Sequence, residues 1–178
     1  GFLIADQLFR HHDRSGSFGL GTFYARRAMR ILPAYAVMVL LYFLFPVLQE
    51  RDGIAPPWKF ASFTMNLGLD LRTQGTFSHA WSLCVEEHFY HVFPLLAAGL
   101  ARREVSARQM LALCITVVLL GIAARGPTWL HWAAIDPPRN WFIEQIYYPT
   151  WARLDGLLMG VLLAALQVHR PQWWQRWQ

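Results

Sequence analysis

The sequence has few charged residues and almost no cysteine. Of its 178 residues, 15% are charged and only Cys84 and Cys114 are cysteines, whereas an ordinary soluble domain has about 25% charged residues. Two cysteines in apolar runs exclude a small disulfide-held scaffold. Lysine is nearly absent as well, since Lys59 is the single lysine among 16 basic residues. The net charge of +5 therefore comes from arginine.

The sequence also lacks the short motifs of several enzyme classes. It contains no HExxH or CxxC pair, so its seven histidines predict no metal site. It contains no GxSxG turn and no Walker phosphate-binding loop. These absences exclude the zinc proteases, α/β-hydrolases and P-loop enzymes that carry those motifs.

Aromatic residues and long apolar runs are abundant. The chain has 12 Phe, 9 Trp and 6 Tyr, and 55% of its residues are hydrophobic, which excludes a disordered protein. A basic, aromatic-rich chain is also typical of nucleic-acid binding. Here the apolar residues form long blocks rather than mixed patches, so we predict no nucleic-acid partner.

The apolar blocks have the length of membrane-spanning helices. Residues 31–48 form an uncharged run of eighteen, close to the about 20 residues that a bilayer core requires. Three further blocks cover 89–101, 110–124 and 154–168, and the first of them is preceded by residues 81–88, which carry Glu86 and Glu87. Residues 1–9 resemble the end of a helix begun upstream. We predict an all-α polytopic membrane helix bundle with about four transmembrane segments and a partial first one. Because the chain opens with Gly rather than Met, we expect a fragment of a larger domain.

Loop charges predict the orientation of this bundle. If residues 10–30 face the cytoplasm, so do the loops at 102–108 and from 170 onward, and positive residues favour cytoplasmic loops. The three cytoplasmic loops hold ten basic residues: Arg10, Arg14, Arg26, Arg27, Arg30, Arg102, Arg103, Arg108, Arg170 and Arg176. The two outer loops hold five: Arg51, Lys59, Arg72, Arg125 and Arg139. Entry of residues 58–69 into the membrane would invert every later segment.

The C-terminal segment QWWQRWQ is open to two interpretations. Trp173, Trp174 and Trp177 lie near Arg176, a composition that suits an interfacial anchor. The same residues also fit the start of a further helix.

Three arginines precede the first long apolar run. Arg30 shares a helix face with both Arg26 and Arg27, because residues three and four apart are neighbours on a helix. Such a cluster can hold phosphates through planar donor groups. The same cluster can also act only as a positive flank that sets orientation.

Two adjacent glutamates lie in the segment WSLCVEEHFY. On a helix, Glu86 shares a face with Ser82 and Tyr90, whereas Glu87 points about 100° away. A charged group at the centre of a membrane helix costs about 2.5–3.5 kcal/mol, so such groups usually face a bundle interior or a wet cavity. Both could instead lie at the interface and interact with the helix dipole.

The segment ARLDGLLMG carries two charges and two glycines. Arg153 and Asp155 lie two apart and do not face each other, so each is expected to have a partner on another helix or to reach the interface. Gly156 and Gly160 have the GxxxG spacing of close helix packing.

Together these segments resemble the membrane-bound acyltransferase family 3. The runs GFLIADQLF, FYARRAMRILPAY, HAWSLCVEEHFYHVFPLL and ARLDGLLMG occur in the order typical of that family. The resemblance covers most of the chain from Gly1 to Gly160. It identifies the chain as a partial acyltransferase domain over residues 1–178, without the family's first helix and later helices.

The resemblance implies an activity and the residues that carry it. It implies transfer of an acyl group, usually acetyl, from acyl-CoA to a hydroxyl of a carbohydrate or lipid-linked glycan in the bacterial inner membrane. The donor is a substrate, and no tightly bound cofactor is implied. Arg26, Arg27 and Arg30 are expected to hold the CoA phosphates, and Glu86 to support the active cavity, with Trp81 and Ser82 as flanking motif positions.

The resemblance also implies a residue that this sequence does not contain. The family's expected general base is a histidine on a helix before the GFLI segment, and no histidine here matches it. We therefore expect this chain alone to be inactive. The alternative is a non-catalytic polytopic membrane protein, such as a glycan transporter.

Overall fold

A computed structural model describes residues 1–103, 107–135, 141–169 and 172. The described chain is helical, and its only bridge outside helices pairs Ile54 with Thr76. The long helices are α1 (Phe2–Ser15), α2 (Leu20–Leu44), α4 (Trp81–Arg102), α5 (Ala107–Ile135) and α6 (Leu154–His169). Shorter elements are η1 (Pro46–Leu48), α3 (Pro57–Ala61), η2 (Ser78–Ala80), the π-helical η3 (Phe142–Tyr147) and η4 (Thr150–Ala152). The predicted all-α class is confirmed.

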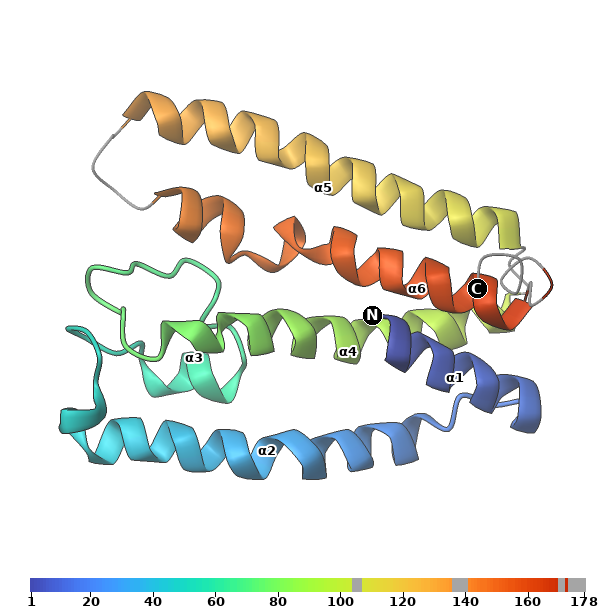
Figure 1. Ribbon diagram of the computed structural model, residues 1–178, viewed down its shortest axis with the longest axis horizontal. Helices are drawn as coiled ribbons and strands as arrows, with labels where there is room; N and C mark the ends of the chain where they lie inside the picture. The colour runs from blue at the N-terminus through green and yellow to red at the C-terminus, as the bar shows by residue number, and fades with distance from the viewer. Residues whose placement is uncertain (104–106, 136–140, 170–171, 173–178) are drawn as a thin grey trace.

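The long helices lie roughly along one axis (Figure 1). α6 packs against both α1 and α5, and α4 lies between α6 and α2 in the view of Figure 1. The start of α2, the end of α4 and the start of α5 lie at one end of the bundle, and the segment 45–80 lies at the other. The described residues therefore follow the alternation that the loop charges predict. Arg139, Arg170, Arg176 and the three tryptophans of the C-terminal segment lie outside the described residues.

Two helices have the length and composition of membrane spans. They are Leu20–Leu44 and Gln109–Ile135, with mean hydropathies of 1.5 and 1.9. Only 6% of each apolar window is buried inside the protein. A core helix of a soluble protein would be mostly covered, so this exposure is consistent with the predicted membrane helix bundle.

The other two predicted spans meet these criteria less fully. The apolar part of α6, Leu154–Val168, is shorter than a span. α4 has 22 residues, enough for about 33 Å, but it carries both glutamates and three basic or histidine side chains. A helical membrane bundle is supported, whereas the number of four spans stays a prediction.

The first apolar helix begins earlier than the sequence predicts. The prediction placed it at 31–48, but α2 starts at Leu20 and ends at Leu44. Arginine is a good helix former, and no breaker separates Gly21 from Pro33. The helix ends where Phe45 takes a non-helical conformation, with φ −122° and ψ 87°, before Pro46, since a residue that precedes proline disfavours the helical region. The three arginines therefore project from the helix itself rather than from a loop.

Arg125 was predicted in an outer loop, and this prediction is wrong. Gly126 and Pro127 suggest a helix end, yet α5 continues through both to Ile135. Arg125 donates to a carboxylate oxygen of Asp155 on α6 at 2.7 Å and also to the Ala152 carbonyl. This pairing neutralises the charge inside the helix pair and gives Asp155 the partner on another helix that its position predicts. Of the other four basic residues assigned to the outer loops, Arg51, Lys59 and Arg72 lie in the segment 45–80, and Arg139 lies outside the described residues.

The segment 58–69 is not a membrane span of its own. Its helix α3 has five residues, and the segment folds over an aromatic cluster of Tyr42, Phe60 and Phe77 at the end of α2. Glu50 links the end of α2 to Phe77, because its carboxylate accepts hydrogen bonds from the Tyr42 hydroxyl at 2.5 Å and from the Phe77 backbone N–H at 3.2 Å. The hydrogen bond from Tyr42 has the larger effect of the two in lowering the pKa of Glu50 from its ordinary value. No extra crossing therefore inverts the later helices.

The second core cluster joins α1, α4 and α6. Its buried residues include Ala5, Leu8, Phe89, Phe93 and Ala164. The GxxxG prediction holds for one glycine: a Cβ on Gly160 would meet the backbone of Phe2, whereas nothing lies within 4 Å of a Cβ on Gly156. Close packing of α1 on α6 therefore depends on Gly160.

The orientation can be tested with single cysteines. In a full-length protein carrying Cys84→Ala and Cys114→Ala, Arg51→Cys should react with an impermeant thiol reagent in intact cells, because residue 51 is exposed at the outer end. Arg103→Cys, exposed at the opposite end, should react only after permeabilisation. Labelling of position 103 in intact cells would contradict the orientation.

Candidate functional site

A cleft of about 980 Å³ lies between α1, the first half of α2 and α4. Its lining includes Arg26, Arg27, Arg30 and Glu86, four of the six site residues predicted from sequence. They come from two helices about 60 residues apart in the chain, so the fold brings both predicted clusters to one cavity. Apolar residues of α1, with Leu83 and Tyr90 of α4, line much of the remaining wall, which also includes the polar side chains of Gln7, His11 and Thr22.

Arg27 is the buried member of the arginine cluster. Its Nη2 and Nε atoms donate to the same Glu87 oxygen, at 2.7 and 3.1 Å, and both side chains are largely buried. Its guanidinium also lies 3.2 Å from the centre of the Tyr90 ring. Arg27 thus forms a buried ion pair and a cation–π contact that together connect α2 to α4.

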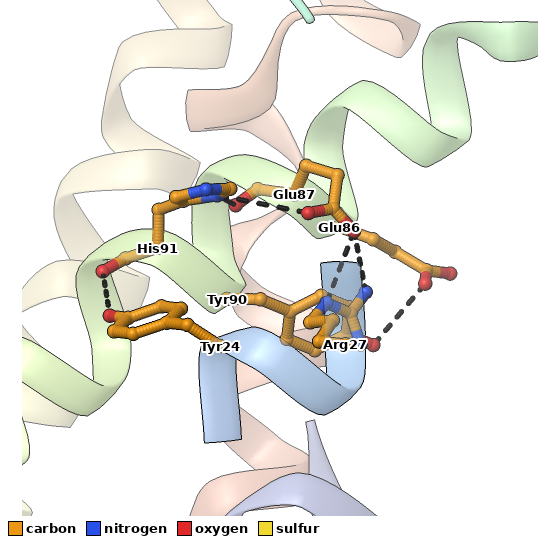
Figure 2. Close-up of polar contacts among 6 residues, drawn as sticks. All are labelled: Tyr24, Arg27, Glu86, Glu87, Tyr90 and His91. Carbon is orange, nitrogen blue, oxygen red and sulfur yellow. Dashed lines mark hydrogen bonds and ion pairs between the residues drawn. The ribbon is translucent and has the colours of Figure 1, made fainter. Parts of the chain in front are cut away.

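The contacts around this pair form one network (Figure 2). The His91 Nδ1 atom lies 2.7 Å from the Glu87 backbone carbonyl and 3.7 Å from its carboxylate. The Tyr24 hydroxyl donates to the His91 carbonyl at 2.8 Å, again linking α2 to α4. The register between the two helices is therefore fixed by polar contacts at two successive turns.

Glu86 takes the opposite orientation to Glu87. It is exposed to solvent and lines the cleft, while Glu87 is buried and does not. The Tyr90 hydroxyl donates to Glu86 at 3.2 Å, as the predicted shared face requires. Among the described residues of the cleft wall, Glu86 is the one carboxylate.

Arg26 and Arg30 are the exposed arginines of the cluster. Both line the cleft, and within the described part of the chain no ion pair involves either of them. Their guanidinium groups are therefore available to an anionic ligand.

Trp81 and Ser82 do not line the cleft. Ser82 donates to the His79 carbonyl at 3.3 Å and lies one turn from Glu86, toward the start of α4. Trp81 stacks on Tyr148 and lies under the Arg153 guanidinium, so it packs the start of α4 against the segment before α6. The structure shows packing contacts for these two motif positions, and their catalytic role stays a prediction.

Sequence reasoning missed two features of the site. It gave Arg27 no partner, because no spacing rule pairs residues 60 positions apart, and it did not place His11 in the cleft wall. Within the described ranges, no group of three or more histidine, cysteine or acidic side chains could hold a metal ion.

Comparison with known proteins supports the predicted family. The family model described as "Acyltransferase domain" matches residues 1–178. The chain is 27% identical over 176 residues to the O-acetyltransferase OatA of Staphylococcus aureus strain NCTC 8325 / PS 47, which covers 92% of this chain and 28% of that protein. OatA of strain MRSA252 gives the same values. The chain thus spans about a quarter of the length of these curated relatives. No solved structure matches it.

The ion pair between Arg27 and Glu87 should be required for stability. Glu87→Gln leaves a buried guanidinium without a counter-charge, and removal of one partner of a buried pair costs about 3–5 kcal/mol. Glu86→Gln, on an exposed side chain, should change the free energy of unfolding by no more than about 0.5 kcal/mol. Denaturant titration of both variants in detergent measures the difference.

A double variant provides the control. Replacing both partners with apolar residues, Arg27→Met with Glu87→Leu, removes the unpaired charge and should recover most of the lost stability. Equal stability of Glu87→Gln and the wild type would show that the pair does not hold α2 to α4.

Proposed function

The chain belongs to the acyltransferase domain family, and from this membership we propose that it moves an acyl group from acyl-CoA to a hydroxyl of a carbohydrate or lipid-linked glycan. The relatives OatA are named O-acetyltransferases, which supports oxygen as the accepting atom and acetyl as one acyl group. We place the protein in the bacterial inner membrane as a multi-pass protein, with the cleft open to the cytoplasmic end of the bundle.

The observation that best supports this proposal is that two arginines in the cleft wall have no ion-pair partner among the described residues. CoA bears several phosphates, and arginine binds phosphate through charge-assisted hydrogen bonds. Arg26 and Arg30 are exposed, line the cleft and have no ion-pair partner among the described residues. We assign the phosphate contacts to these two. Arg27, already bonded to Glu87, positions its neighbours on α2.

Glu86 is assigned a supporting role in the reaction. In the transfer, the acceptor oxygen loses its proton and forms an ester bond to the acyl carbon, while the thioester C–S bond breaks and CoA leaves as a thiol. A positioned carboxylate can hold the acceptor hydroxyl or orient the base that takes its proton. Glu86 is the acidic side chain of the described cleft wall that can do so.

The arginines can be tested by donor binding to the full-length protein in nanodiscs. Arg26→Ala and Arg30→Ala should each weaken acetyl-CoA binding by about tenfold to a hundredfold, since a hydrogen bond to a charged group contributes about 1.5–3 kcal/mol. Lysine at either position should rescue binding only in part. Arg51→Ala, at the far end of the bundle, is the matched control and should bind normally. Wild-type affinity in both cleft variants would contradict the assignment.

Glu86 can be separated from the donor site by a second measurement. Glu86→Gln should bind acetyl-CoA as the wild type does but lose about a hundredfold in acceptor-dependent thioester cleavage, the lower range for acid–base support. The two measurements are the rate of acceptor-dependent thioester cleavage and the affinity for acetyl-CoA, each compared with the wild-type value. Unchanged transfer by a folded Glu86→Gln protein would remove Glu86 from the mechanism. Absence of transfer to any hydroxyl acceptor by the wild type would favour the non-catalytic alternative.

A further inference from the structure

A second, smaller cavity continues from the cleft toward the outer end of the bundle. Its volume is about 300 Å³. It shares Arg30, Ile31 and Leu83 with the cleft wall, so it begins where the cleft ends. The rest of its lining includes Ala34 and Met38 of α2 and Phe77 before α4. We call this cavity the apolar groove.

One face of α2 lines both cavities. Arg26, Arg30, Ala34 and Met38 follow one another at four-residue spacing and so lie in one row on the helix. Each step advances about 6 Å, and the row extends about 18 Å. Along this row the side chains change from two guanidinium groups to a methyl and a thioether. A ligand on this face therefore has an anionic end and an apolar end.

The apolar groove offers no polar partner beyond Arg30. The Tyr35 hydroxyl in its wall donates to the Phe60 carbonyl at 3.1 Å and is occupied by that hydrogen bond. Phe77 is 6% exposed and stacks on Tyr42 and Phe60, which makes it a firm end wall. Hydrocarbon fits such a lining, whereas a sugar would leave its hydroxyls unpaired.

We propose that the apolar groove holds the acyl chain of the donor, so that the protein accepts acyl groups longer than acetyl and Ala34 sets their length. This inference rests on the proposed function. The CoA phosphates lie on Arg26 and Arg30, and the thioester lies where the two cavities meet at Leu83, one helical turn from Glu86. The acyl chain then extends past Ala34 toward Met38 and Phe77. Continuity with the arginine-lined cleft favours a donor chain over a free membrane lipid.

The test measures affinity against chain length in the full-length protein. Acetyl-, butyryl- and hexanoyl-CoA compete with a labelled CoA probe. Wild-type affinity should rise with length, by up to about fourfold for each methylene that is fully buried. Ala34→Phe fills the groove, so its affinity for the three donors should no longer rise with chain length. Ala34→Leu should reduce the rise of affinity with chain length less than Ala34→Phe does. It replaces Ala34→Phe in the test if the phenylalanine variant fails to fold.

The matched control is Ala36→Phe. Ala36 is exposed on α2, lies about 200° around the helix from Ala34 and lines neither cavity. This variant should keep the wild-type dependence on chain length, which also corrects for partition of longer chains into detergent or lipid. Equal affinity for all three donors in the wild type, or equal slopes in the Ala34 and Ala36 variants, would overturn the inference. Failure of the wild type to bind even acetyl-CoA would instead overturn the proposed function.

Discussion

The position of α2 depends on the buried ion pair between Arg27 and Glu87. Lipid tails are as apolar as leucine, so hydrophobic burial does not press one membrane helix against another. The apolar window of α2 is only 6% buried inside the protein, and few of its contacts fix the distance to α4. The guanidinium–carboxylate contact at 2.7 Å supplies a directional link that lipid cannot replace. Together with the hydrogen bond from Tyr24 to the His91 carbonyl, this link sets the register of the two helices that line the cleft.

Adjacent residues divide the work of the site through helix geometry. A helix turns about 100° per residue, so Arg26 and Arg27 face different neighbours, as do Glu86 and Glu87. One arginine and one glutamate meet between the helices and stabilise the fold, while the other arginine and glutamate face the cleft. Neighbouring residues of like charge therefore have different roles. Substitution of Arg27 or Glu87 is expected to reduce stability, whereas substitution of Arg26 or Glu86 is expected to reduce activity.

Sequence patterns predicted local features well and contacts between helices poorly. Long apolar blocks located α6 and the second half of α4, and helical spacing placed Glu86 on one face with Tyr90, because both depend on a few consecutive residues. The predicted span at 31–48 omits the first turns of α2, which carry the three arginines, and the predicted block at 110–124 ends before Arg125, although α5 continues to Ile135. Each error follows from a charge whose partner is distant in sequence. The Asp155 carboxylate that accommodates Arg125 lies on another helix, and no local rule predicts such a partner.

The charged side chains of the bundle fall into two groups, those with an ion-pair partner and those without one among the described residues. Arg125 and Arg27 are each matched by an acidic group inside the bundle, as the cost of a charge in a membrane requires. Arg26 and Arg30 have no such match among the described residues, and Glu86 accepts only the Tyr90 hydroxyl there. Groups of this kind need water or a charged ligand to offset their desolvation. Since the same row of α2 becomes apolar after Arg30, the amphiphilic donor that we propose would match both halves, with its anionic end toward the start of α2 and its acyl carbon near Glu86.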